Sequence, residues 1–307
     1  MEIPGELLKQ ASIIVCTVDR PTDLEACLKS LRPFRAAVAE IIVVNNGPHP
    51  AAVEEIARRH CAKVTSEPRR GLSGARNAGI RAAAGAILAF LDDDAQADPH
   101  WIPRLLAPLA DPQVLAVLGT VWAQTVADPV SQAFDDIYRA HLPDSQLLLE
   151  APREMHPFPL RLAMQGTGSN MAVRREVFDR FGCFDTRFGR GTRIGSGEEA
   201  DLLLALLLGG GKIVVEPAAR IFHRHPTEWR AFRRWAFQSG CAHTAILTKY
   251  FLQEPSRHRE ILRYIASRLR RRPAAEASAA TKLKVPRIPL FLGSLYGPIA
   301  YLLSRKE

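Results

Sequence analysis

The sequence predicts an α/β fold built on a mostly parallel sheet with helices on both faces. Short apolar, β-branched segments alternate with helical segments through the first half of the chain. This alternation is typical of βαβ units, in which parallel strands are buried on both sides. The chain has 307 residues and is 47% hydrophobic, which suffices for one large domain or for one domain with an appendage.

The expected elements of the first half follow one another in strand-to-helix order. We expect strands at residues 12–18, 40–47, 62–67, 86–92 and 114–123, and helices at residues 22–31, 51–60 and 74–84. Thr22 and Glu25 have the spacing of a capping box at the start of the first helix. In such sheets ligands bind beyond the carboxyl ends of the strands, so the polar residues there are the candidates for function.

The second half is less regular and changes character at Trp229. We expect a short strand turning into a helix over 168–182, an apolar helix at 198–210, and strands at 212–217 and 219–223. Beyond Trp229 the chain is aromatic, basic and helical, with a basic helix at 257–273, a small-residue linker and an apolar run at 288–303. The sequence therefore predicts a helical C-terminal extension after the sheet.

The cysteine content and the net charge limit the possible cellular compartment and the possible classes of binding partner. The five cysteines are an odd number without CxxC spacing, and we expect reduced, mostly buried thiols of a cytosolic protein: Cys16, Cys27, Cys61, Cys183 and Cys241. No signal peptide is apparent at the start of the sequence. The formal net charge of +9 would suit anionic substrates, nucleic acid or an anionic membrane, and its distribution decides between them.

Polar residues gather where the first-half strands end. The first strand ends near Thr17, Asp19 and Arg20, and the second ends at Asn45 and Asn46. Since parallel strands end at one edge of the sheet, we expect these side chains to share a site.

Three consecutive aspartates, Asp92, Asp93 and Asp94, follow the fourth strand. Hard oxygen ligands at a strand end suit Mg²⁺ or Mn²⁺, and a cation would relieve the repulsion between the carboxylates. The alternative is a solvated acidic turn that leads to a helix after Asp98.

A glycine-rich, basic segment at 69–79 opens a predicted helix, so that its backbone N–H groups and Arg76 could face a phosphate. The segment matches neither the P-loop nor the GxGxxG pattern, and a flexible surface turn is the alternative. However, the segment and the three aspartates are expected at the same edge of the sheet. Together they favour a site that binds a nucleoside diphosphate and a metal ion.

Six motifs in this order resemble the family 2 glycosyltransferases, inverting enzymes with a GT-A nucleotide-sugar fold. The resemblance covers roughly residues 11–226 and rests on SIIVCTVDRP, IIVVNNG, GLSGARNAG, AFLDDDAQADPHWI, GTGSNMAVRREVF and GSGEEADLLLALLLGGGKIVVEPAARIFHRH. It implies transfer of a sugar from a nucleotide-diphosphate donor to a hydroxyl of a glycan or lipid-linked acceptor, with Mn²⁺ or Mg²⁺ as cofactor. It also implies a catalytic domain over 1–228, with a nucleotide-sugar half at 1–125 and an acceptor half at 126–228, followed by an extension at 229–307.

The resemblance assigns the donor and metal residues. Asp94 would ligate the metal, and Asp92 and Asp93 would contact ribose or support the ligand shell. His223 would complete the metal shell, although a histidine at a strand end is more often structural, and His225 is a weaker choice. The remaining residues that it assigns to the donor are Thr17, Asp19, Arg20, Asn45, Asn46, Gly74 and Arg76.

One donor position departs from the family. Asn45 stands where the family often has an aspartate, and an amide offers both an acceptor and donors but no charge. The donor therefore stays open between a UDP-, a dTDP- and a GDP-sugar.

The resemblance also assigns the chemistry of transfer. Glu199 matches the position of the catalytic base, which takes the proton from the acceptor hydroxyl, with Glu198 and Asp201 as substitutes. Carboxylates that complement a helix dipole are the alternative for this segment. Asp185 and Asn170 are assigned to the acceptor.

The C-terminal charge favours a membrane surface over nucleic acid. Residues 257–272 carry seven arginines with apolar residues on one stripe, as in a helix that lies on an anionic bilayer. The run at 288–303 is short for a span and contains Pro289, Gly293, Gly297 and Pro298. No nucleic-acid motif accompanies the charge. We therefore expect a cytoplasmic enzyme, peripheral at the inner face of the membrane.

Two other functions remain open at this stage. A nucleotidyltransferase would also use paired aspartates on such a sheet, but the segment CTVDRP lacks the glycine and lysine expected in its first loop. The second alternative is a non-catalytic protein that kept the fold and binds nucleotide sugars.

Overall fold

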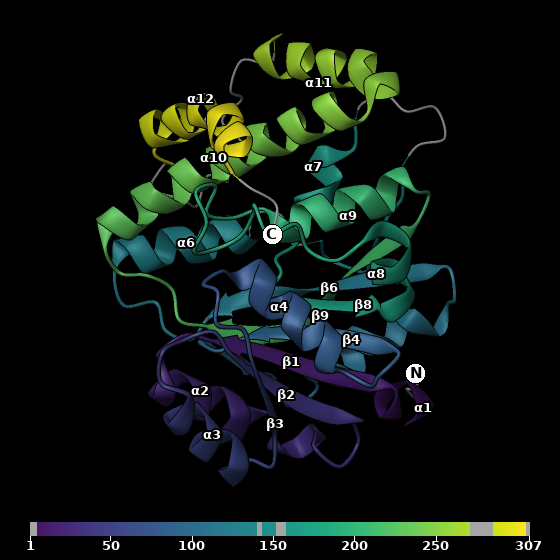
Figure 1. Cartoon of the computed structure of the whole chain (residues 1–307), viewed down its shortest axis with the longest axis vertical. Helices are drawn as coiled ribbons and strands as arrows, with labels where there is room; N and C mark the ends of the chain where they lie inside the picture. The colour runs from purple at the N-terminus through teal and green to yellow at the C-terminus, as the bar shows by residue number, and fades with distance from the viewer. Residues whose placement is uncertain (1–4, 140–142, 152–157, 271–284, 305–307) are drawn as a thin grey trace.

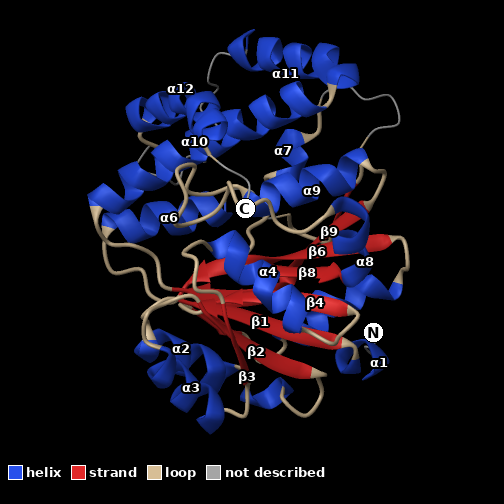
Figure 2. Ribbon diagram, in the orientation of Figure 1, coloured by secondary structure: helices blue, strands red, loops and turns tan. Residues whose placement is uncertain are grey.

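A computed structural model of the chain describes residues 5–139, 143–151, 158–270 and 285–304. These residues form a nine-stranded sheet with helices on both faces, and the C-terminal helices lie together on one side (Figures 1 and 2). The helical C-terminal extension predicted after the sheet is confirmed.

The sheet is mixed but mostly parallel. Its strands follow the order β3-β2-β1-β4-β8-β6-β9-β5, with β7 paired to β9. Six strands run in one direction, while β5, β7 and β8 run against them. The strands are β1 (Ala11–Thr17), β2 (Glu40–Asn45), β3 (Lys63–Ser66), β4 (Ile87–Asp92), β5 (Ala95–Ala97), β6 (Val114–Ala123), β7 (Leu147–Leu149), β8 (Asn170–Arg174) and β9 (Lys212–His223).

Two hydrophobic layers flank the sheet, and alternate residues of each strand feed them. In β1, Ile14 belongs to one layer, while Ile13 and Val15 belong to the other. The first layer packs α4, α8, α9 and α10, and the second packs α2, α3 and α5. The helices with more than one turn are α2 (Pro21–Ser30), α3 (Pro50–Arg59), α4 (Leu72–Ala82), α5 (Trp101–Leu106), α6 (Pro129–Arg139), α8 (Arg175–Phe181), α9 (Glu198–Leu208), α10 (Trp229–Gln253), α11 (His258–Arg270) and α12 (Arg287–Leu303). The shorter turns are α1 (Gly5–Lys9), η1 (Arg32–Phe34), η2 (Ala107–Ala110), α7 (Leu160–Ala163) and η3 (Pro255–Arg257).

Two local predictions were wrong. The capping box of Thr22 and Glu25 does not form, because α2 begins one residue earlier with Pro21 at its first position and has no side-chain cap. Proline suits that position, since it has no N–H to leave unpaired. The two strands expected at 212–217 and 219–223 are one strand, β9, whose pairing with β6 skips residues opposite Gly119.

The C-terminal helices share the core of the sheet. Helices α10, α11 and α12 contribute Cys241, Ile246, Ile261 and Ala300 to the same hydrophobic cluster as α4, α8 and α9. The division of the chain at residue 228 therefore stays a prediction. None of the described helices is both long enough and apolar enough to span a bilayer.

Glycines bring α12 onto α10. A Cβ atom on Gly293 would collide with the backbone of Phe237, and one on Gly297 would collide with Thr244 and Cys241. The glycines that made the run at 288–303 a poor membrane span thus serve a close crossing of two helices.

The cysteines are only in part as expected. All five are free; Cys27 and Cys241 are buried, Cys16 is half-buried, and Cys61 and Cys183 are exposed.

Candidate active site

A cavity of about 410 Å³ opens at the carboxyl ends of β1 and β4. The segment after β1, the three aspartates after β4, the start of α4 and the end of β9 surround it. Its lining consists of Cys16, Thr17, Val18, Asp19, Arg20, Asn46, Arg70, Gly71, Leu72, Ala75, Asp92, Asp93, Asp94, Arg190, Gly191 and His223. The first strand, the acidic cluster and the basic segment therefore meet at one edge, as the sequence predicts.

Asp92, Asp94 and His223 form a group that fits a divalent cation. Their ligand atoms all lie within 4.8 Å of one another, and Nε2 of His223 is 3.0 Å from Oδ1 of Asp94. Nδ1 of His223 is buried without a hydrogen-bond partner among the described residues. Two carboxylates and one imidazole are ligands that suit Mn²⁺, and carboxylates suit Mg²⁺. The antiparallel pair of β5 and β9 holds the group, since it places Ala95 opposite His223.

Thr17 and Arg20 hold the other faces of the aspartates. Oγ1 of Thr17 donates to Asp93 at 2.7 Å, and Arg20 donates to Asp93 at 3.1 Å and to Asp94 at 2.7 Å. Burial raises the pKa of Asp93 to about 6, although Arg20 and Thr17 oppose the rise. Burial also acts to raise the pKa of Asp94, but His223 and Arg20 outweigh it and hold this pKa well below the usual range. The Asp94 carboxylate is therefore charged at neutral pH.

The asparagines after β2 shape the rim of the cavity. The amide of Asn45 closes a turn with the backbone of Gly47 in both directions and does not line the cavity. Asn46 lines the cavity and donates to the carbonyls of Glu67 and Arg69, while its oxygen accepts from Gly71 N–H. Asn46 thus fixes the basic loop at the cavity edge, and the donor contact expected of Asn45 finds no support in its position.

Asp19 lies at the rim with a left-handed backbone. Its φ of 49° is unusual for a residue with a side chain, and such conformations are found more often at functional sites. Its place on the cavity lining agrees with the predicted donor contact.

Arg76 does not line the cavity. The side chain is 2% exposed, donates to Glu198 at 2.8 Å and to Asp92 at 3.3 Å, and lies over the rings of Phe90 and Phe184. Arg76 therefore bridges the acidic cluster and α9, and this position gives the predicted diphosphate contact no support. Gly74 likewise does not line the cavity, and a Cβ there would meet Glu67 at an ordinary 3.6 Å.

Arg70 and Arg190 are the guanidinium groups that line the cavity besides Arg20, and the sequence prediction missed both. Arg70 lies in the basic segment that was recognised, and Arg190 lies in a glycine-rich segment ahead of α9. Gly71, with a φ of +154°, precedes α4 and lets the helix begin at the cavity, where its N–H groups attract anions.

Glu198 and Glu199 begin α9. Gly197 precedes them with a φ of +92°, and a Cβ there would press on Ala242 of α10. Glu198 is buried against Arg76 and is thereby a partner of Arg76 rather than a free base. Glu199 is half-buried, and burial together with repulsion from Glu198 raises its pKa to about 8 against the charge of Arg76.

Three further predicted residues have structural partners elsewhere. Lys249 of α10 pairs with Asp201 at 2.5 Å and with Asp185 at 3.0 Å, and Arg187 pairs with Asp185. Asp185 and Asp201 line a different cavity of about 610 Å³. Asn170 is fully buried, accepts from Trp101 Nε1 and donates to the carbonyls of Thr120 and Ala219. None of the three lines the cavity at the strand ends, and the acceptor role of Asn170 and Asp185 and the base role of Asp201 stay predictions.

A second cavity of about 490 Å³ adjoins the metal group. It shares Arg20, Asp94, Arg190 and His223 with the first cavity. Its other lining residues are Phe134, Tyr138, Arg224, His225, Pro226, Thr227, Glu228, Ala231, Arg234, Trp235 and Gln238. The acidic group therefore lies between two cavities, and aromatic side chains of α6 and α10 contribute to the second.

Residues 12–182, more than half of the chain, match the family described as glycosyl transferase family 2. The chain belongs to this family. Membership of this family favours sugar transfer over the nucleotidyltransferase considered from the sequence.

Curated relatives of this family 2 glycosyltransferase include the succinoglycan biosynthesis protein ExoM of Rhizobium meliloti (strain 1021). It is 30% identical over 276 residues, which cover 80% of this chain and 78% of that protein. A pre-mycofactocin glycosyltransferase of Mycobacterium tuberculosis (strain ATCC 25618 / H37Rv) is 26% identical over 78% of this chain. The chain spans about half the length of that relative, 48%.

Solved structures share the fold of this family 2 member. A mannosyltransferase from Pyrobaculum calidifontis in complex with GDP-Man and Mn²⁺ has a TM-score of 0.60 at 18% identity, covering 96% of this chain and 87% of that one. Glucosyl-3-phosphoglycerate synthase from Mycobacterium tuberculosis, in complex with Mn²⁺ and UDP-Glc, has a TM-score of 0.56 at 19% identity, covering 79% of this chain and 82% of that one. These similarities confirm the predicted GT-A fold.

Proposed function

We propose that this family 2 glycosyltransferase is a metal-dependent, inverting enzyme that moves a sugar from a nucleoside-diphosphate donor to an acceptor hydroxyl. The observation that carries the proposal is the group of Asp92, Asp94 and His223 between two cavities at the strand ends. Solved proteins of the same fold bind nucleotide sugars together with Mn²⁺.

The first cavity has the chemistry of a donor site. Arg70, Arg190 and the start of α4 would hold the diphosphate, since guanidinium groups and helix N-termini both favour phosphate. Asp19 and Asn46 line the part of the cavity where the nucleoside would lie. A UDP-, a dTDP- and a GDP-sugar all remain candidates for the donor.

Asp92, Asp94 and His223 would hold Mn²⁺ or Mg²⁺ beside that diphosphate. A bound divalent ion neutralises the charge that grows on a leaving diphosphate. Thr17 and Arg20 keep the aspartates in place, and Arg76 orients Asp92.

Glu199, in the first turn of α9 and on the lining of neither cavity, is the proposed base. It would take the proton from the acceptor hydroxyl while that oxygen attacks the anomeric carbon of the donor sugar. The bond from this carbon to the diphosphate oxygen breaks, the nucleoside diphosphate leaves with the electron pair, and the configuration at the carbon inverts. The raised pKa of Glu199 gives its carboxylate a strong affinity for that proton.

The second cavity would receive the acceptor. Tyr138 and Trp235 offer aromatic faces beside the metal group, and such faces suit the apolar side of a sugar ring. We therefore propose a glycan or a lipid-linked glycan as acceptor, and no nucleic acid.

An anionic membrane surface is the proposed location, at the cytoplasmic face. The basic residues of α11 and the exposed apolar side chains of α12 support it, among them Ile288 and Leu302, which are 73% and 66% exposed. Such a combination favours binding to anionic lipid surfaces.

A thermal-shift panel tests the donor site. UDP, GDP and dTDP would each be added with Mn²⁺, with Mg²⁺ or with EDTA. A ligand that binds only the folded state at about 100 times its Kd stabilises it by about 2.7 kcal/mol. We expect one nucleotide to raise the melting temperature, with metal required for most of the rise.

Asp94→Asn should abolish the metal-dependent part of that shift, while Asp179→Asn, at an exposed position of α8, should leave it unchanged. A wild-type protein that no nucleotide stabilises, with or without metal, would contradict the donor site. Product analysis then identifies the reaction. Inverting sugar transfer releases free nucleoside diphosphate and leaves the sugar on the acceptor with inverted configuration at its anomeric carbon.

A further inference from the structure

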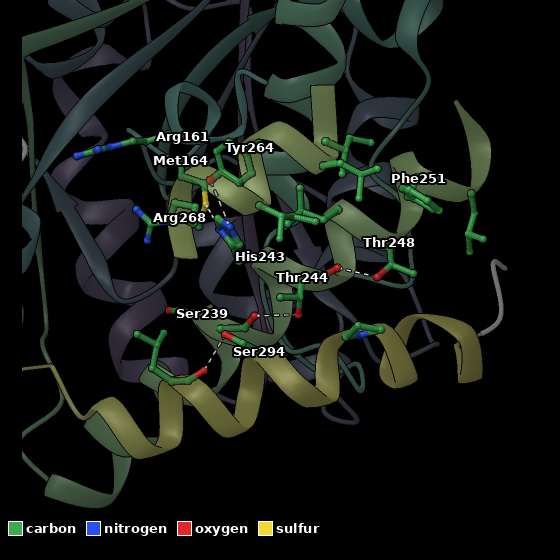
Figure 3. A pocket seen from close by; sticks show the side chains of 18 residues that line it. Arg161, Met164, Ser239, His243, Thr244, Thr248, Phe251, Tyr264, Arg268 and Ser294 are labelled. Atoms are coloured by element: carbon green, nitrogen blue, oxygen red, sulfur yellow. Dashed lines mark hydrogen bonds between the residues drawn. The ribbon is translucent and has the colours of Figure 1, made fainter. Parts of the chain in front are cut away.

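The largest of the cavities described here lies away from the strand ends, between α10, α11 and α12. Its volume is about 690 Å³. Figure 3 shows the side chains that line it: Arg161, Met164, Ser239, Gly240, His243, Thr244, Leu247, Thr248, Phe251, Leu252, Ile261, Leu262, Tyr264, Ile265, Arg268, Leu290, Ser294 and Pro298.

The side chains that line this interhelical cavity are mostly apolar, so an occupant would contact mainly hydrocarbon groups. Leu247, Ile261 and Ile265 form part of the wall, and the exposed fractions of Leu252 and Leu262 are both 55%. Large apolar side chains that stay exposed next to an apolar cavity are the mark of an interaction site.

Four polar side chains of the walls already have partners inside the protein: Thr244, Thr248, Ser294 and His243. Thr244, Thr248 and Ser294 donate their hydroxyl protons to backbone carbonyls of their own helices. His243 lies between the sulfur of Met164 and the hydroxyl of Tyr264, each 3.3 Å away. A polar ligand would therefore find few partners in the cavity, whereas an alkyl chain would need none.

Charge is concentrated at one end of the cavity. Arg161 and Arg268 lie at the end that holds His243 and Tyr264, while Phe251 lies at the other (Figure 3). Both arginines are exposed, as is Arg270 in the last turn of α11. A cavity with an apolar interior and a cationic end matches an amphiphile with an anionic head.

Neighbouring surfaces point to a membrane as the source of that amphiphile. Helix α12, which forms one wall, exposes apolar side chains along its length: Ile288, Phe291, Leu292, Leu295, Ile299, Leu302 and Leu303. The basic α11 forms another wall of the same cavity, so the apolar and cationic surfaces of one region would meet the same bilayer.

Two other occupants fit less well. A twofold contact with a second copy would bring two arginine-rich α11 helices together, and like charges oppose such an interface. The segment 271–284 of this chain, outside the described residues, has the sequence RRPAAEASAATKLK, with Leu283 as its single large aliphatic residue. It lacks the side chains to fill an apolar cavity of this size.

We propose that the interhelical cavity binds the hydrocarbon chain of an anionic membrane lipid, whose phosphate lies against Arg161 and Arg268. The inference rests on the membrane location proposed above, but not on the transfer reaction. The membrane location proposed above needs only adsorption of the protein on the bilayer surface. The present inference adds a specific site that takes up one lipid chain from the bilayer.

The test uses the full chain and decyl phosphate below its critical micelle concentration, so that no bilayer is present. Calorimetry should detect binding of this probe to the wild type in the absence of any nucleotide. Thr248→Trp and Ile265→Trp fill the cavity from α10 and from α11 and should each weaken binding about tenfold or more. Circular dichroism confirms that each variant is folded.

Leu302→Ser is the matched control, since Leu302 is exposed on α12 and does not line the cavity. It should keep wild-type affinity for decyl phosphate while weakening sedimentation with anionic vesicles. Arg268→Gln should weaken decyl phosphate binding several-fold and leave decanol binding unchanged.

A wild type that fails to bind decyl phosphate, or folded tryptophan variants that bind it equally well, overturns the proposal. Vesicle binding that persists in that case means that the membrane location holds and only the cavity fails. Because donor binding is measured separately, neither result depends on the transfer reaction.

Discussion

Arg76 is the residue that links the two halves of the proposed chemistry. It is buried and donates to Asp92 in the acidic group and to Glu198 beside the proposed base. Gly168 makes room for it, because a Cβ there would lie 2.5 Å from a guanidinium nitrogen. A side chain that touches neither substrate in this arrangement can still decide the rate, because it positions groups that do.

We expect Arg76→Met to lower kcat by about 100-fold or more, since it leaves Glu198 buried without its partner and Asp92 free to turn. The loss of a buried pair should also cost roughly 3–5 kcal/mol of stability. Steady-state kinetics and urea unfolding measure the two effects. Arg81→Met, on the exposed face of the same helix, is the control and should change neither by much. Wild-type kcat in a folded Arg76→Met protein would refute the positioning role.

The raised pKa of Glu199 predicts the pH dependence of transfer. Its pKa of about 8 means that the carboxyl is protonated, and unable to accept a proton, at lower pH. The value of kcat/KM should therefore rise with pH and level off above about 8. Initial rates between pH 6 and 9.5 measure this profile.

Glu199→Gln should remove that rise and lower kcat by about 10²–10⁴-fold, while nucleotide binding persists. Equal rates for this variant and the wild type would show that another group accepts the proton.

Single residues were predicted well where backbone position decides their place. Asp94 directly precedes β5 and His223 ends β9, and these two strands pair with Ala95 opposite His223, so the meeting of Asp94 and His223 follows from the topology. The partners of Arg76, Asn170 and Asp185 lie far away in the sequence and could not be predicted from the motifs: Glu198, Trp101 and Lys249. The motif shows that such a side chain is present, but the folded neighbourhood decides which way it turns.

At the scale of elements, α10 and α12 form the closest contact in the C-terminal region. The backbones of the two helices are in contact at Gly293. An added methyl group there would therefore force one of the helices to move. This crossing was missed from the sequence, where the same glycines were weighed only against a membrane span.

Gly293→Ala should destabilise the fold by about 1–3 kcal/mol, because it overpacks this crossing. Ile299→Ala is the control on the same helix, since Ile299 is 52% exposed and should matter little. Urea unfolding of the two variants compares them. Equal stability of both would mean that the crossing is looser than described.

Lys249, like Arg76, is a cation that pairs with two carboxylates, and it joins α10 to α9. From α10 it neutralises Asp201 of α9 and Asp185 of the preceding loop, and these two carboxylates hold its pKa above the ordinary value despite burial. Lys249→Met leaves Asp201 and Asp185 as buried acids and should cost about 3–5 kcal/mol. Lys29→Met, at an exposed position of α2, should cost little. A Lys249→Met protein as stable as the control would contradict the structural role of this ion pair.

At the scale of the whole molecule, the alternation of strands and helices was enough to predict the fold class. The periodicity of apolar segments encodes burial on both faces directly, which is why the first half agrees with the structure. The docking of 229–270 and 285–303 could not be predicted, because an amphipathic helix shows that it has an apolar face but not which surface covers it.

The shared core predicts how the chain unfolds. Because α10, α11 and α12 bury residues in the cluster that packs α4, α8 and α9, we expect a single cooperative transition in urea. Fluorescence and far-UV circular dichroism should give coincident curves. Two separate transitions would instead support an independent unit after residue 228.

Helix α10 has 25 residues and makes three different kinds of contact along its length. Trp235 lines the cavity beside the metal group, Gly240 and Thr244 receive α12, and Lys249 reaches the carboxylates of α9. Each residue added to or removed from an α-helix turns everything beyond it by about 100°. A single insertion near Gly240 would therefore point Lys249 away from its partners while leaving Trp235 in place. Evolutionary change in this helix should proceed by substitution, and length variation should be confined to the loops at its ends.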